Sequence, residues 1–160
     1  MGPVVKVKVK FKITLFALSF FACLLPACVL WLSLRTVEVV AVHENGNHSY
    51  ILVKNFPFTD KGRINWWQEN QDMLKNSHKV PQPDTYGFFT VVFWDFGDGY
   101  KEEGKYDRLC FEDMNPPRNC IEKNKVFTVS HGRNMGIYFT TNNKIYRMKK
   151  SGKIVKDESD

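Results

Sequence analysis

Acidic residues are absent from the first 35 positions of this 160-residue chain, which contain five Lys or Arg side chains. The remaining residues hold the other 18 of the 23 basic side chains and all 17 acidic ones. The net charge of +6 therefore comes almost entirely from the N-terminal end. Because the rest of the chain is nearly neutral, it offers no basic surface for phosphates, and we expect no nucleic-acid partner.

Charge of either sign is also absent from residues 13–34, ITLFALSFFACLLPACVLWLSL. A helix of this length spans roughly 33 Å, close to the hydrocarbon thickness of a bilayer, so we predict a transmembrane anchor in contact with membrane lipid. Basic residues flank the run unevenly, with Lys6, Lys8, Lys10 and Lys12 before it and Arg35 after it. Because positive charge stays on the cytoplasmic side, residues 1–12 should be cytoplasmic and the chain from residue 36 onward exported.

A clear small-x-small cleavage site is missing from the end of this run, which disfavours ordinary signal cleavage. Trp31 suits the membrane interface and Arg35 can snorkel, so an uncleaved anchor is the favoured interpretation. The segment Leu25-Pro26-Ala27-Cys28 resembles a bacterial lipoprotein signal. Attachment of lipid through Cys28 therefore stays an alternative, although Pro26 and the apolar residues that follow Cys28 are atypical of such signals.

Cysteine is scarce, and the four residues form two pairs. Cys23 and Cys28 lie in the apolar run and are interpreted as small apolar side chains. Cys110 and Cys120 lie in the exported part, where an oxidising compartment would let them form a disulfide. Two separate buried thiols are the alternative. Because no second closely spaced Cys/His pair accompanies them, we expect no zinc site and no other cofactor.

The exported residues are enough for one domain with its own core, which we place at 36–155, followed by a frayed tail at 156–160. An Asn-Gly turn signal between two β-rich runs predicts a hairpin over residues 36–53. A helix is predicted from Thr59 or Asp60 to about residue 76, because apolar residues recur there at helical spacing.

Further strands are predicted at 88–94, where both faces are apolar as in a central strand, and at 106–111. Short β-like runs separated by turns predict an antiparallel meander, at residues 125–129, 136–140, 144–148 and 153–155. The fold class expected from this order is α+β, with a mainly antiparallel sheet and one packed helix.

Catalytic signatures are missing. The nucleophile-elbow motif Gly-x-Ser-x-Gly does not occur, and the acidic cluster of Asp95, Asp98, Glu102 and Glu103 lacks the spacing of a calcium loop. We interpret this cluster as a charged turn and predict a protein that is not an enzyme. The alternative is an envelope hydrolase, in which the first three of these carboxylates would converge in a pocket. His43 and His48 flank the hairpin turn and are interpreted as solvated.

The adjacent Trp66 and Trp67 are the aromatic feature of most interest. Neighbouring positions on a helix diverge by about 100°, so one ring should enter the core while the other lies near the surface. An exposed Trp is typical of a protein-contact hot spot, which makes these residues the candidates for partner binding. The alternative is that neighbouring loops cover both rings.

Four strings resemble a family of small enterobacterial proteins of unknown function that are described only as putative membrane proteins. They are Trp31-Leu32-Ser33-Leu34-Arg35, NFPFTDKGRINWW at 55–67, FWDFGDGYKEEGKYDRLCFEDM at 93–114 and NCIEKNK at 119–125. The resemblance runs from the anchor to about residue 148. It implies a Gram-negative inner-membrane location with the domain in the periplasm, and it carries over no catalytic or binding residue.

These observations predict a single-pass inner-membrane protein whose periplasmic domain binds an unknown protein without catalysing a reaction. Immunity-type neutralisation of an envelope toxin is one form such a role could take. The alternative is a structural accessory subunit of a larger inner-membrane complex.

Overall fold

The computed structural model describes residues 20, 22, 24, 26, 28, 35–142 and 144–157. The chain divides into two compact units, Met1–Thr36 and Val37–Asp160. The predicted cytoplasmic segment and most of the predicted anchor at 13–34 lie outside the described residues, as do Lys6, Lys8, Lys10 and Lys12. Among the residues that are described, no helix is long and apolar enough to cross a membrane.

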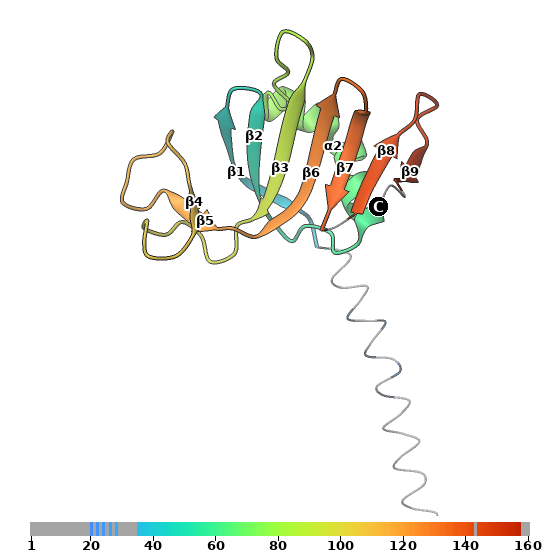
Figure 1. Ribbon diagram of the computed structural model, residues 1–160. Coiled ribbons are helices and arrows are strands. Elements are labelled where there is room, and N and C mark those ends of the chain that lie inside the picture. The colour runs from blue at the N-terminus through green and yellow to red at the C-terminus, as the bar shows by residue number, and fades with distance from the viewer. Residues whose placement is uncertain are drawn as a thin grey trace, which may run out of the picture. The chain divides into compact units, whose positions relative to one another are not determined.

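The second unit is an α+β domain, as predicted, with one helix against a mainly antiparallel sheet (Figure 1). Its described residues form a seven-stranded sheet in the order β1-β2-β3-β6-β7-β8-β9. The strands are β1 (Glu38–Asn45), β2 (His48–Lys54), β3 (Phe89–Asp95), β6 (Lys125–Gly132), β7 (Gly136–Thr141), β8 (Lys144–Met148) and β9 (Ile154–Lys156).

Strands β1 and β2 form the predicted hairpin, with Asn45 opposite His48 across the turn. Gly46 occupies the first loop position with φ +60°, a conformation that glycine adopts without a steric penalty. Side chains alternate between the two faces of a strand, so Ile51 and Val53 point to one face of the sheet and Leu52 to the other. Each face of this hairpin packs into a separate apolar cluster.

The helix α2 (Asp60–His78) connects β2 to β3, which lie parallel to each other from His48 opposite Thr90 to Val53 opposite Asp95. Thr59 caps its start, because the hydroxyl oxygen accepts a hydrogen bond from the Gly62 N–H at 3.0 Å. At its end Lys79 adopts φ 57°. The predicted helix is thus confirmed, whereas the parallel pairing of its two flanking strands was not predicted.

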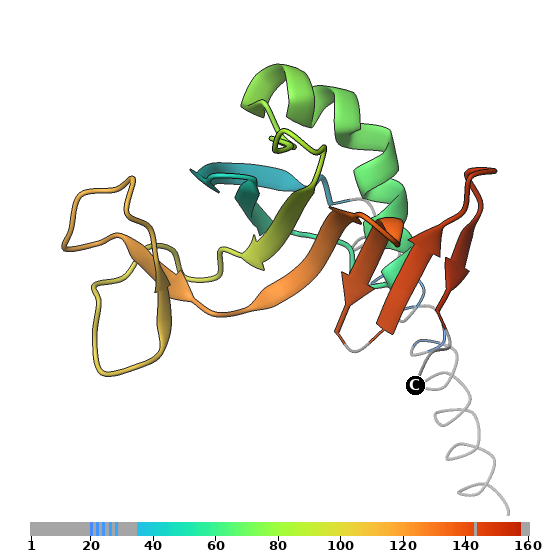
Figure 2. The ribbon, with the colours of Figure 1, turned by 45° about the horizontal axis from the view of Figure 1, so that its top comes forward.

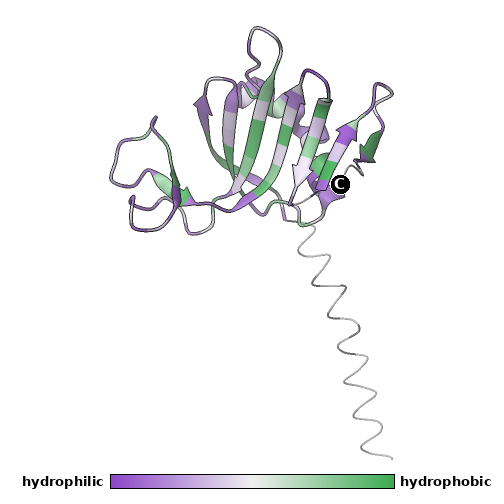
Figure 3. Ribbon diagram, in the orientation of Figure 1, coloured by the Kyte–Doolittle hydropathy of each residue, from purple (hydrophilic) through white to green (hydrophobic). Residues whose placement is uncertain are grey.

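The main core lies between α2 and one face of the sheet (Figure 2). Phe93 is fully buried in the central strand β3, and aromatic rings surround it. Ring centroids lie 5.0 Å from it at Phe56, 5.8 Å at Trp66, 6.1 Å at Trp67 and 5.5 Å at Phe127. Hydrophobic residues concentrate in these central strands (Figure 3), as the apolar run at 88–94 predicted.

Strands β6 to β9 form the predicted antiparallel meander. The start of α2 is fastened to it by Asp60, whose carboxylate accepts hydrogen bonds from the Tyr146 hydroxyl at 2.8 Å and the Lys144 ammonium at 3.2 Å. Burial raises the pKa of Asp60, but these hydrogen bonds outweigh it and hold that pKa below its usual value. After β9, the Asp157 carboxylate accepts a hydrogen bond from Arg147 at 2.6 Å, so side-chain contacts with the sheet continue past residue 155.

Candidate interaction site

Residues 96–124, which connect β3 to β6, form an extension of the domain that we call the arm. It contains a second, two-stranded sheet of β4 (Arg108–Cys110) and β5 (Cys120–Glu122), beyond the β1 side of the main sheet (Figure 1). The predicted strand at 106–111 corresponds to β4, while β5 was predicted only as part of a loop. A bridge between Lys101 and Cys120 adds a third backbone segment to this small sheet.

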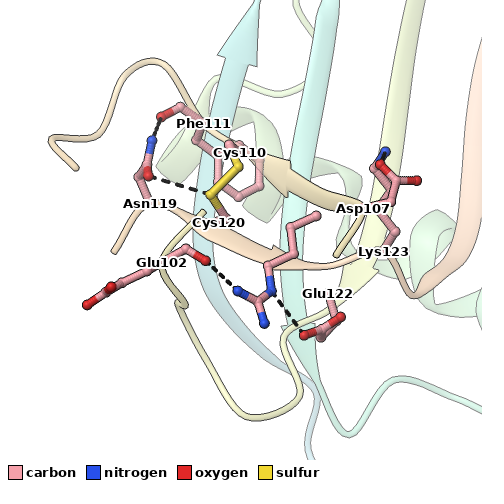
Figure 4. The surroundings of a disulfide bond; sticks show 9 residues. Glu102, Asp107, Cys110, Phe111, Asn119, Cys120, Glu122 and Lys123 are labelled. Carbon is pink, nitrogen blue, oxygen red and sulfur yellow. Dashed lines mark hydrogen bonds and ion pairs between the residues drawn. A yellow bond between two sulfur atoms is a disulfide. The ribbon is translucent and has the colours of Figure 1, made fainter. Parts of the chain in front are cut away.

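Cys110 and Cys120 are directly opposite each other on β4 and β5 and form a disulfide (Figure 4). The predicted pairing is therefore what the structure shows. The bond closes the turn between the two strands, and the Asn119 side-chain amide donates to the Phe111 carbonyl oxygen at 3.1 Å within that turn. The arm is thus braced internally by a covalent bond as well as by strand pairing.

A second apolar cluster holds the arm against the main sheet, on the face opposite α2. Leu52 of β2 and the arm residues Phe111 and Ile121 are its buried centre, each with no more than 4% of its surface exposed. Because Leu52 alternates with Ile51 and Val53, strand β2 contributes to both cores at once. The arm therefore shares a buried apolar interface with the main sheet.

His43 of β1 reinforces this packing. Its ring stacks on Phe111 with centroids 3.8 Å apart and planes within 10°. Its Nδ1 lies 2.8 and 2.9 Å from the two carboxylate oxygens of Asp113, and its Nε2 lies 2.8 Å from the Tyr100 hydroxyl. One β1 side chain thus contacts three residues of the arm.

The two ring nitrogens of His43 have different partners. Because the carboxylate of Asp113 can only accept, Nδ1 donates to it, and the Tyr100 hydroxyl is the hydrogen-bond partner of Nε2. Burial, together with the charge of Asp113, raises the pKa of Tyr100, which keeps its hydroxyl a donor. The interpretation of His43 as a solvated turn residue was wrong, because only 6% of its surface is exposed.

Replacing His43 should weaken the attachment of the arm. We expect His43→Ala to lower the free energy of unfolding by about 2–3 kcal/mol, because a stacked ring and two hydrogen bonds, one of them to a charged group, are lost. Urea unfolding followed by tryptophan fluorescence measures this change. The matched control is His48→Ala, an exposed histidine of the same hairpin, which should change stability by less than about 0.5 kcal/mol. Equal effects of the two substitutions would contradict the proposed role of His43.

At the outer end of the arm, an ionic network braces the exposed residues 102–107, which we call the arm loop. The Glu122 carboxylate lies 3.0 Å from the Lys101 ammonium. It also lies 3.2 Å from Nε of Arg108, which donates to the Glu102 carbonyl oxygen as well (Figure 4). The hydrogen bond from Lys101, followed by that from Arg108, lowers the pKa of Glu122. Both ends of the arm loop are therefore fixed.

Every residue of the arm loop is exposed, and Tyr106 has 75% of its surface accessible. Its ring lies 5.7 Å from the Arg108 guanidinium, a cation–π contact that orients the ring without covering it. Around it are Glu102, Glu103, Lys105 and Asp107. An aromatic ring that is exposed, oriented and surrounded by charged residues has the composition of a protein-contact hot spot.

The acidic cluster predicted from the sequence is distributed over this region. Asp95 ends β3, where its carboxylate accepts from the Asn124 amide at 3.3 Å. Asp98 is 90% exposed at its side chain and lies 3.6 Å from the Lys101 ammonium, while Glu102 and Glu103 are exposed in the arm loop. Within the described part of the chain, no three His, Cys, Asp or Glu residues are grouped so as to hold a metal ion.

Trp66 and Trp67 occupy different environments on α2. Trp67 is only 3% exposed and belongs to the main core, and Trp66 is half-buried, with its ring 5.3 Å from Phe56. Partner binding by this pair stays a prediction, in which Trp66 has the more accessible ring. Sequence reasoning missed Tyr106 and assigned His43 to solvent, because the contacts of His43 come from segments far away in the chain.

Comparison with known proteins gives one match. A family model described as an enterobacterial putative membrane protein, DUF943, matches residues 8–158. No curated protein matches the chain, and no solved structure matches it.

Proposed function

We propose that this chain, which belongs to the DUF943 family of enterobacterial putative membrane proteins, is a membrane-anchored protein-binding module. Its arm loop would provide the contact with the partner. The observation that carries the proposal is the combination of full exposure at residues 102–107 with bracing at both ends of that segment. A loop that is already ordered loses little conformational entropy when it binds, so more of its contact energy appears as affinity.

The family description supports a membrane location, and we propose a single-pass topology in the inner membrane. The charge-free residues 13–34 would form the anchor, and the lysines before them would keep the N-terminus in the cytoplasm. The Cys110–Cys120 bond supports placing the second unit in the periplasm, because disulfides persist in oxidising compartments. Attachment through a lipid on Cys28 is the alternative, and it would also expose the domain outside the cytoplasm.

The partner itself would distinguish two roles within this proposal. A toxin that acts in the envelope would indicate immunity-type neutralisation, and a subunit of an inner-membrane assembly would indicate an accessory role. The buried aromatic core and the exposed arm loop suit both roles equally. An envelope hydrolase is less well supported, because Asp98 and Glu102 are exposed side chains rather than the lining of a common pocket.

A site-specific photo-crosslink tests this proposal in the intact envelope. The full-length protein would carry benzoylphenylalanine in place of Tyr106, or in place of Tyr86 as the matched control. Both tyrosines are 75% exposed, but Tyr86 lies in the loop before β3, outside the arm. We expect one discrete adduct from position 106 and none from position 86. Tyr106→Ala should weaken capture of the same partner by about 30-fold, while Tyr86→Ala should not.

Two results would contradict the proposal. Identical adducts from both positions would indicate non-specific contact with neighbouring envelope proteins. Discrete capture that survives Tyr106→Ala unchanged would place the interface elsewhere, and crosslinking from Trp66 would then test the other candidate.

A further inference from the structure

A pocket of about 410 Å³ opens at the carboxyl ends of β2 and β3. We call it the strand-end pocket, and it shares no residue with the arm loop. Asn55 follows β2, Asp95 ends β3, and α2 begins five residues after Asn55. Because the two strands are parallel, their carboxyl ends meet at the same edge, which is where open sheets with helical crossovers usually bind ligands. The volume is within the range of small-ligand sites.

Arg63 of α2 is the central polar side chain of this pocket. Its Nε donates to the Pro57 carbonyl oxygen at 2.8 Å, and its Nη1 donates to the Val126 carbonyl oxygen at 2.7 Å. These bonds fix the guanidinium plane while leaving other N–H groups of the fork without a hydrogen bond in the described structure. Arg63 is half-buried, and this burial lowers the pKa of its guanidinium, while the charge of Asp60 opposes that effect.

Neither Arg63 nor Lys125, the second cation of the pocket lining, forms an ion pair with any residue that the structure describes. The charge of Asp60 acts on Arg63 from beyond ion-pair distance, so an anionic ligand on the unused N–H groups of the fork would add a direct charge-assisted hydrogen bond. Asp95 is the one acidic residue of the lining, so the three charges sum to +1. This balance matches a singly charged carboxylate better than a phosphate dianion.

The remaining walls indicate what the carboxylate is attached to. Phe58 lines the pocket with 75% of its surface exposed. An apolar group beside the carboxylate could therefore pack against its ring. Asn55 and Asn142, which also line the pocket, are two of the three non-glycine residues with positive φ among those described, at 57° and 43°. Asparagine adopts this conformation readily in turns, and here the two turns bring polar amide side chains to the rim of the pocket.

We propose that the strand-end pocket binds a carboxylate carried next to an apolar group, as at the C-terminal residue of a peptide or in a free apolar amino acid. Arg63 and Lys125 would hold the carboxylate, and Phe58 would cover the apolar group. Asp95 would accept a hydrogen bond from the neighbouring N–H. This site is separate from the proposed contact of the arm loop with a partner protein.

Calorimetric titration of the full-length protein in detergent tests this inference. The probes are the tripeptide Ala-Ala-Phe with a free C-terminus, the same tripeptide as its C-terminal amide, phenylalanine and inorganic phosphate. We expect the amide to bind at least about tenfold more weakly than the free acid, because the contact to the charged fork is lost. Phosphate should bind more weakly than the tripeptide. If the tripeptide binds more tightly than phenylalanine, the ligand of the pocket is the C-terminal residue of a peptide. If phenylalanine binds more tightly, the ligand is a free amino acid.

Substitutions locate the binding. Arg63 also holds backbone carbonyls, so its replacement could unfold the domain, and Lys125→Glu is the variant of choice because that lysine is exposed. Lys125→Glu should weaken the binding of the free-acid tripeptide about tenfold. Lys149→Glu makes the same charge change at an exposed lysine outside the pocket, and the affinity for the tripeptide should stay within about twofold of the wild-type value. Equal binding of acid and amide, no binding of the acid, preference for phosphate, or equal effects of the two lysine variants would each overturn the inference. None of these results depends on the crosslink at Tyr106.

Discussion

Phe93→Ala is expected to lower the free energy of unfolding by about 3–5 kcal/mol, the range found when a fully buried phenylalanine is truncated. Phe93 has no exposed surface, and its ring contacts Phe56, Trp66, Trp67 and Phe127. Removing the ring leaves a cavity between the central strand and α2 that the surrounding rings cannot fill without leaving their rotamers. A domain with the usual stability of about 5–15 kcal/mol would become marginal.

Chemical unfolding of the full-length protein measures this loss, with tryptophan fluorescence as the signal. Phe58→Ala is the control, because Phe58 is 75% exposed and its removal should change stability by less than about 0.5 kcal/mol. If Phe93→Ala cost no more than Phe58→Ala, the aromatic cluster around β3 could not be the main core.

Loss of the disulfide should also destabilise the domain strongly. The double substitution Cys110→Ser with Cys120→Ser is expected to lower the free energy of unfolding by about 2–3 kcal/mol, because a crosslink spanning this short segment restricts the unfolded chain. The wild-type protein should lose a similar amount when it is reduced. Since the bond lies in the arm, proteolysis at residues 102–107 should also accelerate in the variant.

Cys28→Ser controls for the loss of a thiol as such, because Cys28 is a free cysteine outside the arm. It should leave both the unfolding curve and the proteolysis rate unchanged. Alkylation of the wild-type protein after extraction from the envelope gives an independent check. Modification of Cys110 and Cys120 without prior reduction would show that the bond is not formed in the cell.

The elements that sequence predicted correctly are those whose signals are local. The hairpin follows from Gly46 and the β-rich runs beside it, and α2 follows from Thr59 at the cap and from Ile64, Trp67 and Leu74 at helical spacing. The disulfide followed from two cysteines in the exported part around a turn. In each case the decisive residues belong to one short, continuous stretch of the chain, so pattern and spacing are sufficient.

Contacts between distant segments could not be predicted in the same way. His43 and Asp113 are 70 residues apart, and an isolated histidine beside a turn carries no signal that a carboxylate and a phenol will flank it. The parallel pairing of β2 with β3 depends on how α2 packs rather than on either strand. The exposed Tyr106 differs from an ordinary loop tyrosine only through the fixed ends of the arm loop.

The position of His43 on β1 determines how mechanical load would pass through the protein. β1 is an edge strand, and it is also the strand into which the N-terminal segment continues. The arm is fastened to that same strand through Asp113, Tyr100 and Phe111. A partner pulling on the arm would therefore load β1 through the His43 contacts, in addition to β3 and β6, which continue directly into the arm. Without His43, that load would pass only through the backbone of β3 and β6 and through the packing on Leu52.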